Sequence, residues 1–117
     1  CSEGGLAVAL AECCISGFEK IGATIDLGAA AGRTDELLYN ESPSRVVVSI
    51  GAEHRAAWEA LGVDNVFLGE VGGKVLKMQI AAQNLIWDVE ELRLFWWNAI
   101  GQAMGEEPSG EISREAC

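Results

Sequence analysis

Apolar and polar residues recur with different periods along this chain, and these periods predict most of its elements. Residues Leu6 to Ile15 are almost wholly apolar, and Glu12 is the single charged residue among them. A helix that is apolar nearly all round is buried on most of its sides, so we expect a core helix that opens near Gly4 or Gly5. Ala23 to Leu27 alternates apolar and polar residues, which predicts a half-buried strand.

A polar elbow in the middle of the chain leads into a β-branched run. Residues 28–35 are small and polar and predict a loop. The elbow, Asn40 to Arg45, contains Pro43, which cannot donate to a sheet ladder. Val46 to Ile50 has high strand propensity and little alternation, so we expect a strand that is buried on both faces. A polar turn beside such a strand is a common ligand site, although Asn and Ser turns more often bond only their own backbone.

The second half of the chain predicts a helix followed by short strands. Residues 51–61 carry an apolar stripe at helical spacing. Val66 to Val71 and Val75 to Ile80 are short apolar runs separated by Gly72-Gly73, which predicts two strands paired as a hairpin. Leu85 to Trp87 predicts a further short strand.

The last predicted helix begins at Asp88, whose carboxylate can cap it, with Glu91 in the spacing of a capping box. Its apolar face consists of Leu92, Phe95, Trp96, Ala99, Ile100 and Ala103. Trp96 and Trp97 lie about 100° apart around a helix, so they cannot both face the core. We therefore expect one of them to cover a neighbouring domain or a dimer surface.

These elements predict an α+β fold, with a mixed β-sheet and helices packed on it. We expect Leu10, Cys13, Val47 and Trp96 in its core. One domain, residues 1–104, accounts for the periodic part of the chain. Residues 105–117 are acidic and polar and predict a flexible tail.

The charge of the chain narrows the class of partner. The 117 residues include 8 Lys and Arg against 18 Asp and Glu, a formal net charge of −10. Nucleic-acid binding and anionic membrane surfaces both require basic residues, so we expect neither. An anionic small molecule would need its charge met locally by an arginine, by backbone N–H groups, by a metal or by another domain.

Cysteine and histidine do not form a metal-binding pattern in this sequence. Cys1, Cys13, Cys14 and Cys117 lack C-x-x-C spacing, and His54 is the single histidine. Cys13 and Cys14 fall in the first apolar helix, where we expect them to pack as small hydrophobes. His54 lies between charged neighbours, so we expect it on the surface. This cysteine usage is typical of a reducing, cytoplasmic protein.

Two features could carry chemistry. Gly4 and Gly5 open the first helix, whose N-terminus can offer N–H groups to an anion. Glu41, Ser42 and Arg45 bring a carboxylate, a hydroxyl and a guanidinium into the elbow. The common nucleotide-binding, serine-hydrolase and zinc-protease motifs do not occur in the sequence.

Four segments resemble, in the same order, the C-terminal domain of the phosphoribosylformylglycinamidine synthase family. They are CSEGGLAVALAE at residues 1–12, LLYNESPSR at 37–45, LGEVGG at 68–73 and VEELRLFWWNAI at 89–100. The likeness runs over about residues 1–104, and the first segment is specific at its length. The His-Asp pair that usually precedes CSEGG in the family is absent, so we expect this sequence to begin inside the motif.

The resemblance implies a fold and a reaction. The family belongs to the aminoimidazole ribonucleotide synthetase superfamily, whose C-terminal domains have α/β/α layers with partial ferredoxin-like topology. The parent enzyme uses ATP, Mg²⁺ and glutamine-derived ammonia to convert a formylglycinamide ribonucleotide into its amidine in purine biosynthesis. The resemblance also implies an ATP-binding domain and a glutaminase subunit as partners, with no cofactor held by this chain itself.

The family carries two copies of this domain, and the present sequence resembles the second. In the first copy an ES-Q segment contacts the ribonucleotide. Glu41 and Ser42 match its first two positions, and Pro43 stands where the family has glutamine. We expect no catalytic residue and no metal ligand in this chain. The candidate substrate- or nucleotide-binding residues are Gly4, Gly5, Glu41, Ser42 and Arg45.

Two hypotheses follow. In the first, the chain is a domain or fragment of the ligase, inactive when isolated, that supplies scaffold and a vestigial or regulatory nucleotide site. In the second, it is a freestanding, non-catalytic binding or assembly module that pairs with a second copy of itself through its sheet and Trp97.

Overall fold

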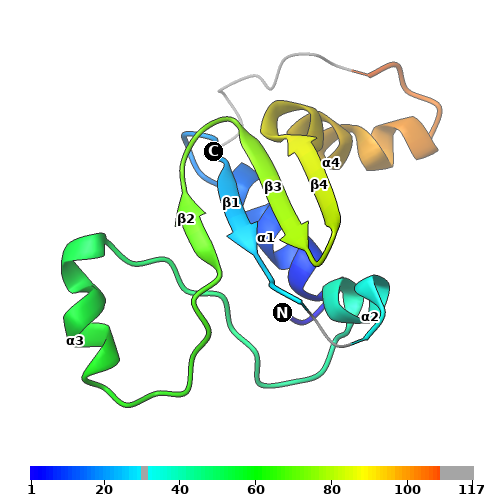
Figure 1. The fold of residues 1–117 in the computed structure, drawn as a ribbon. Helices are drawn as coiled ribbons and strands as arrows, with labels where there is room; N and C mark the ends of the chain where they lie inside the picture. The colour runs from blue at the N-terminus through cyan, green and yellow to red at the C-terminus, as the bar shows by residue number, and fades with distance from the viewer. Residues whose placement is uncertain (30–31, 109–117) are drawn as a thin grey trace.

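The computed structural model describes residues 1–29 and 32–108, which form a mixed four-stranded sheet with helices packed on it (Figure 1). This confirms the α+β class that the sequence predicts. In chain order the elements are α1 (Gly5–Ile15), β1 (Ala23–Asp26), α2 (Thr34–Tyr39), the 3₁₀ turn η1 (Ala52–His54), α3 (Arg55–Glu59), β2 (Gly69–Val71), β3 (Val75–Ile80), β4 (Gln83–Asp88) and α4 (Val89–Ala103).

The strand order is β2-β1-β3-β4, which places β1 inside the sheet. β1 runs parallel to β3 and antiparallel to β2, and β4 runs antiparallel to β3. The predicted hairpin around Gly72-Gly73 is therefore wrong, because β1 lies between the two strands and Gly22 bonds to both glycines of the turn. The two-residue hairpin is instead β3–β4, and its Ala81 has a φ of 50°. Alanine seldom adopts this left-handed conformation, and the turn residues Ala81 and Ala82 include no glycine or asparagine. The sequence therefore contains no sign of a hairpin at this position.

The core lies between one face of the sheet and the helices, and Figure 1 shows α1 behind β1 and β3. Alternate residues of β1 and β3 point to this side, as period-two burial requires. α1 also packs against α2 and α4. The buried apolar residues are Leu6, Ala7, Leu10, Cys14, Ala23, Ile25, Leu38, Leu76, Met78, Ile80 and Val89.

The four core predictions have different outcomes. Leu10 is 5% exposed and confirms its prediction. The prediction that Cys13 is buried is wrong: Cys13 is exposed while Cys14 is buried, because α1 buries only part of its circumference. Val47 is only partly buried, and Trp96 is 59% exposed, so the prediction that Trp96 is buried is wrong.

Residues 46–50 do not form the predicted buried strand. They have no ladder partner, and Val46, Val48 and Ile50 are exposed. The chain runs outside the sheet here, after α2, then passes through α3 and returns to the sheet at β2 (Figure 1). The radius of gyration is 16.1 Å, whereas a compact chain of this length has about 13 Å. Residues 46–50 have high strand propensity, but pairing with a neighbouring strand supplies most of a strand's stability. Without a neighbouring strand, these residues stay outside the sheet.

The helices agree with the sequence in position more than in packing. α4 begins as predicted, since the Asp88 carboxylate accepts a hydrogen bond from the Glu91 N–H at 3.0 Å. α3 falls inside the predicted residues 51–61 but buries no residue. α2 was predicted partly as loop, yet it forms with Asp35 and Glu36 in its first turn and Leu38 in the core.

Two remaining predictions concern the surface and the tail. His54 is exposed, as expected, and lies 3.6 Å from the Glu53 carboxylate. Cys117 and most of the predicted tail lie outside the described residues. None of the helices in the described part combines the length and apolarity that crossing a membrane demands.

Candidate functional site

The elbow contacts the N-terminus of α1, so the structure brings the candidate residues together. Oε1 of Glu41 accepts a hydrogen bond from the backbone N–H of Gly4 at 2.8 Å. The amino group of Cys1 donates to the carbonyl oxygen of Arg45 at 2.9 Å. These two bonds, between residues 37 and 44 positions apart in sequence, join the start of the chain to the elbow. We call this arrangement the elbow clamp.

Gly5 allows α2 to approach α1 closely beside the clamp. Its φ is 67°, and a Cβ built there would lie 2.7 Å from the carbonyl oxygen of Leu38 and 2.8 Å from the Cα of Tyr39. These neighbours are backbone atoms, which cannot rotate away. Glycine is therefore required at this position both by the left-handed conformation and by the available space.

Inside the elbow, side chains bond the backbone of the turn. Oδ1 of Asn40 accepts hydrogen bonds from the backbone N–H of Ser42 at 2.7 Å and from its hydroxyl at 2.6 Å. The Arg45 guanidinium donates to the carbonyl oxygens of Asn40 and Ser42. This is the Asx-type turn that the sequence offered as the more common alternative to a ligand site.

The electrostatics of the clamp follow from the helix terminus. The N-terminus of α1 carries partial positive charge and is the place where an anion would bind. The Glu41 carboxylate is at that end already, so an anionic ligand would have to displace it from the Gly4 N–H. Sequence reasoning identified both halves of the clamp but not that they bond to each other.

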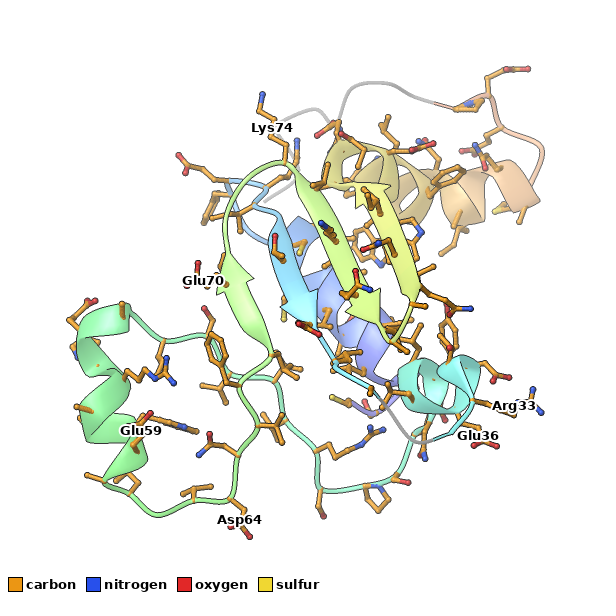
Figure 2. The ribbon with its side chains drawn as sticks, viewed as in Figure 1. Arg33, Glu36, Glu59, Asp64, Glu70 and Lys74 are labelled. Atoms are coloured by element: carbon orange, nitrogen blue, oxygen red, sulfur yellow. The ribbon has the colours of Figure 1, made fainter. Side chains whose placement is uncertain are left out.

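An open hollow of about 570 Å³ lies next to the elbow and is lined by Asp35, Glu36, Tyr39 and Asn40. Its wall is acidic, and Figure 2 shows Glu36 and Arg33 pointing outward from the region of α2. Arg33 forms an ion pair with Asp35 at 2.6 Å, and this hydrogen bonding lowers the pKa of the Asp35 carboxyl.

A second hollow of about 510 Å³ lies at the start of α4 and is lined by Glu19, Lys20, Lys74, Asp88, Val89 and Glu90. The Glu90 carboxylate pairs with Arg93 and, at 2.9 Å, with Lys20. Hydrogen bonds from Arg93 and then Lys20 lower the pKa of Glu90 to about 2. Lys20 and Glu90 are far apart in sequence, so no local pattern could have predicted this cluster.

Metal-ligating side chains do not gather in the described part of the chain, where no three His, Cys, Asp or Glu residues could hold an ion. Cys1, Cys13 and Cys14 are free thiols. Burial raises the pKa of the Cys14 thiol, and the neighbouring Cys13 raises it further. The described residues thus offer a hydrogen-bonded clamp rather than a metal centre.

The chain is similar in sequence to curated synthase subunits, whereas no protein-family model matches it. It is 38% identical to phosphoribosylformylglycinamidine synthase subunit PurL of Anaeromyxobacter sp. (strain Fw109-5), over 98% of this chain and 17% of that protein. It is 49% identical to PurL of Synechococcus sp. (strain JA-2-3B'a(2-13)), over 62% of this chain and 10% of that protein. It is 32% identical to PurL of Prochlorococcus marinus (strain MIT 9303), over 95% of this chain and 15% of that protein.

These alignments agree with the four segments that the sequence shares with the synthase family and with the α+β fold that they imply. The chain spans between a tenth and about a sixth of the curated relatives it matches. It is therefore a PurL-related domain, corresponding to a limited portion of the phosphoribosylformylglycinamidine synthase subunit.

Proposed function

We propose that this domain works as part of a phosphoribosylformylglycinamidine synthase, the cytoplasmic ligase that converts formylglycinamide ribonucleotide to its amidine with ATP and glutamine-derived ammonia. The observation that carries the proposal is the 38% identity to a PurL subunit over 98% of the chain. Within that enzyme the domain supplies scaffold beside the ATP-binding domain, and a glutaminase subunit supplies the ammonia. The isolated 117-residue chain is inactive.

The elbow clamp is the part of this domain that we assign to the ribonucleotide. Gly4, Gly5, Glu41, Ser42 and Arg45 lie together, and Glu41 holds the helix N-terminus where a phosphate or a ribose hydroxyl group would approach. In the isolated domain the carboxylate and the guanidinium both bond to the protein's own backbone. We infer that the clamp orients the elbow and exchanges its bonds for ligand bonds only in the assembled enzyme.

The donor groups of the described residues do not fit Mg²⁺-ATP. No three ligands converge among the described residues, and the Gly4 N–H and the Arg45 guanidinium already have partners. Mg²⁺ in nucleotide sites needs carboxylate ligands placed together beside the phosphates. We therefore assign ATP and Mg²⁺ to the remainder of the synthase.

A chimeric synthase tests the proposal. Residues 1–104 replace the matching segment of the Anaeromyxobacter PurL subunit, and amidine formation is measured with ATP, Mg²⁺ and ammonium. We expect the chimera to retain synthase activity and the isolated chain to have none. A chimera that folds but makes no amidine, or turnover by the isolated chain, would contradict the assignment.

The role of the clamp has its own control. In the chimera, Glu41→Gln keeps the shape of the side chain but removes its charge, and Glu53→Gln removes a carboxylate that is 73% exposed on η1. We expect the first substitution to lower kcat/KM for the ribonucleotide about tenfold or more, because the Glu41 carboxylate, once released from the Gly4 N–H, is proposed to accept a hydrogen bond from a ribose hydroxyl group, and a hydrogen bond to a charged group is worth roughly 1.5–3 kcal/mol. Equal effects of the two substitutions on kcat/KM would show that the elbow is not part of the ribonucleotide site.

A further inference from the structure

Asn40, which opens the elbow, is held in place by α2. It directly follows that helix, and its backbone N–H donates to the carbonyl oxygen of Glu36 at 3.1 Å. Leu38, two residues earlier, is 2% exposed and lies in the core. The residue itself is exposed, so its side chain lies at the surface on a backbone that the helix fixes.

The side chain of Asn40 determines where the proton of the Ser42 hydroxyl group points. The backbone N–H of Ser42 can only donate, so the Asn40 atom that lies 2.7 Å from it must be the amide oxygen, Oδ1, and not the amide nitrogen. The Ser42 hydroxyl lies 2.6 Å from the same oxygen, which has no proton to give. The hydroxyl group therefore donates its proton to Asn40, and only the lone pairs of Ser42 Oγ remain for another group.

The elbow around Ser42 consequently offers acceptors. The Ser42 N–H is taken by Asn40, and Pro43 has no N–H. The Arg45 guanidinium donates to the carbonyl oxygens of Asn40 and Ser42, and so braces the same two residues. Between them lies Glu41, whose carboxylate also only accepts. Since Glu41 and Ser42 are both exposed, two adjacent acceptors face the solvent.

We propose that Asn40 is a positioning residue that makes Ser42 a hydrogen-bond acceptor, so that the elbow selects a hydroxyl group of the ribose and not the phosphate, which rests on the proposed function of this site in binding a ribonucleotide. A ribose hydroxyl can donate to Ser42 Oγ, and the two vicinal hydroxyls supply donors side by side for the two adjacent acceptors. A phosphate oxygen accepts, so it would meet the lone pairs of Ser42 and the negative charge of Glu41.

The chimeric synthase tests the proposal with the ribonucleotide and with two analogues in which fluorine replaces the 2′- or the 3′-hydroxyl. Fluorine is similar in size to a hydroxyl group but cannot donate a hydrogen bond. The measured quantity is the ratio of kcat/KM for the ribonucleotide to kcat/KM for each analogue. At one of the two positions we expect a ratio of about five or more, because one hydrogen bond typically contributes roughly two- to tenfold. Ser42→Ala should lower that ratio to about one, since the acceptor is then lost.

Substitutions of Asn40 separate positioning from a merely structural role. Asn40→Ala leaves the Ser42 proton free to point toward the ligand, so the ratio should fall about twofold or more. Asn40→Asp retains the acceptor oxygen and should retain the ratio. A structural role would lower kcat/KM for all three compounds alike and leave the ratio unchanged. The matched control is Asn65→Ala, because Asn65 also bonds nearby backbone, donating to the Val63 carbonyl at 2.7 Å, but lies outside the elbow. It should leave the ratio as in the wild type.

The outcomes separate this proposal from the function on which it rests. In an active chimera, ratios near one at both positions, or a ratio that Asn40→Ala and Ser42→Ala leave unchanged, would overturn the selection of a hydroxyl group and leave the proposed function standing. Circular dichroism must show that each variant is folded, and Ser42→Ala alone decides the question if Asn40→Ala unfolds. For variants that bind without turnover, dissociation constants from calorimetry give the same ratio. A wild-type chimera that neither binds nor converts the ribonucleotide would contradict the proposed function and this proposal with it.

Discussion

Replacing Gly5 with alanine should destabilise the domain by more than its backbone conformation alone explains. A residue other than glycine at φ 67° costs about 1–2 kcal/mol. The added Cβ would also lie 2.7 Å from the Leu38 carbonyl oxygen, so α1 and α2 would have to separate by several tenths of an ångström. Forcing extra atoms into a packed site typically costs a further 1–3 kcal/mol or so. We expect a total loss of about 2–5 kcal/mol, a large part of the roughly 5–15 kcal/mol that stabilises an ordinary domain.

Gly62→Ala is the matched control, because Gly62 has a φ of 64° and a Cβ there would meet nothing within 4 Å. Both substitutions change the entropy of the unfolded chain equally, so their difference isolates the contact between α1 and α2. In urea, with a slope of about 1.5 kcal/mol/M, Gly5→Ala should lower the midpoint by roughly 2 M and Gly62→Ala by about 1 M or less. Equal shifts of the two midpoints would refute the close approach beside the elbow clamp.

Three further outcomes follow from burial and charge. Leu10→Ala should lower the free energy of unfolding by about 2–5 kcal/mol in the same urea assay, because Leu10 is buried in the core, and a loss below about 0.5 kcal/mol would place it on the surface. Glu90 has a folded-state pKa of about 2, below its unfolded value, so its contribution to stability is present above about pH 4.5 and is lost as the pH falls toward 2. Glu90→Gln should flatten acid unfolding over that interval, and an unchanged pH profile would contradict the pairing with Arg93 and Lys20. In the native protein, iodoacetamide should label Cys13 much faster than Cys14, because the Cys14 thiol is buried and its pKa is raised. Peptide mapping measures the two labelling rates, and equal rates would show that α1 presents a different side to the core.

Elements whose signal is local could be predicted from the sequence. α1, β1 and α4 follow from an apolar run, an alternation and a capping aspartate, and each forms close to its predicted residues. The hairpin around Gly72-Gly73 could not be predicted correctly, because β1 comes from residues 23–26 and inserts between the two strands. Period-two patterns identify a strand but not its neighbour when the neighbour is distant in sequence.

The sequence also could not predict which side of a helix faces the core. α1 is apolar on nearly all sides, so its periodicity could not tell that Cys14 is inside and Cys13 outside. α4 is clearly amphipathic, but its apolar side with Trp96 lies away from the sheet. Periodicity locates a stripe and says nothing of what covers it, since the covering surface belongs to another element or another molecule.

The elbow clamp links the binding of an anion to the contact between α1 and the elbow. The Glu41 carboxylate and an incoming anion would compete for the same Gly4 N–H, so a ligand that binds there must release Glu41 first. At this exposed position the lost hydrogen bond costs on the order of 1 kcal/mol, which lowers the affinity for the ligand about fivefold. The released elbow would remain tied to α1 through the bond from Cys1 to the Arg45 carbonyl, and Gly5 would keep α2 against α1. The anchoring contacts are therefore distinct from the contact that a ligand replaces, so the elbow can change its hydrogen bonds while α1 and α2 stay packed.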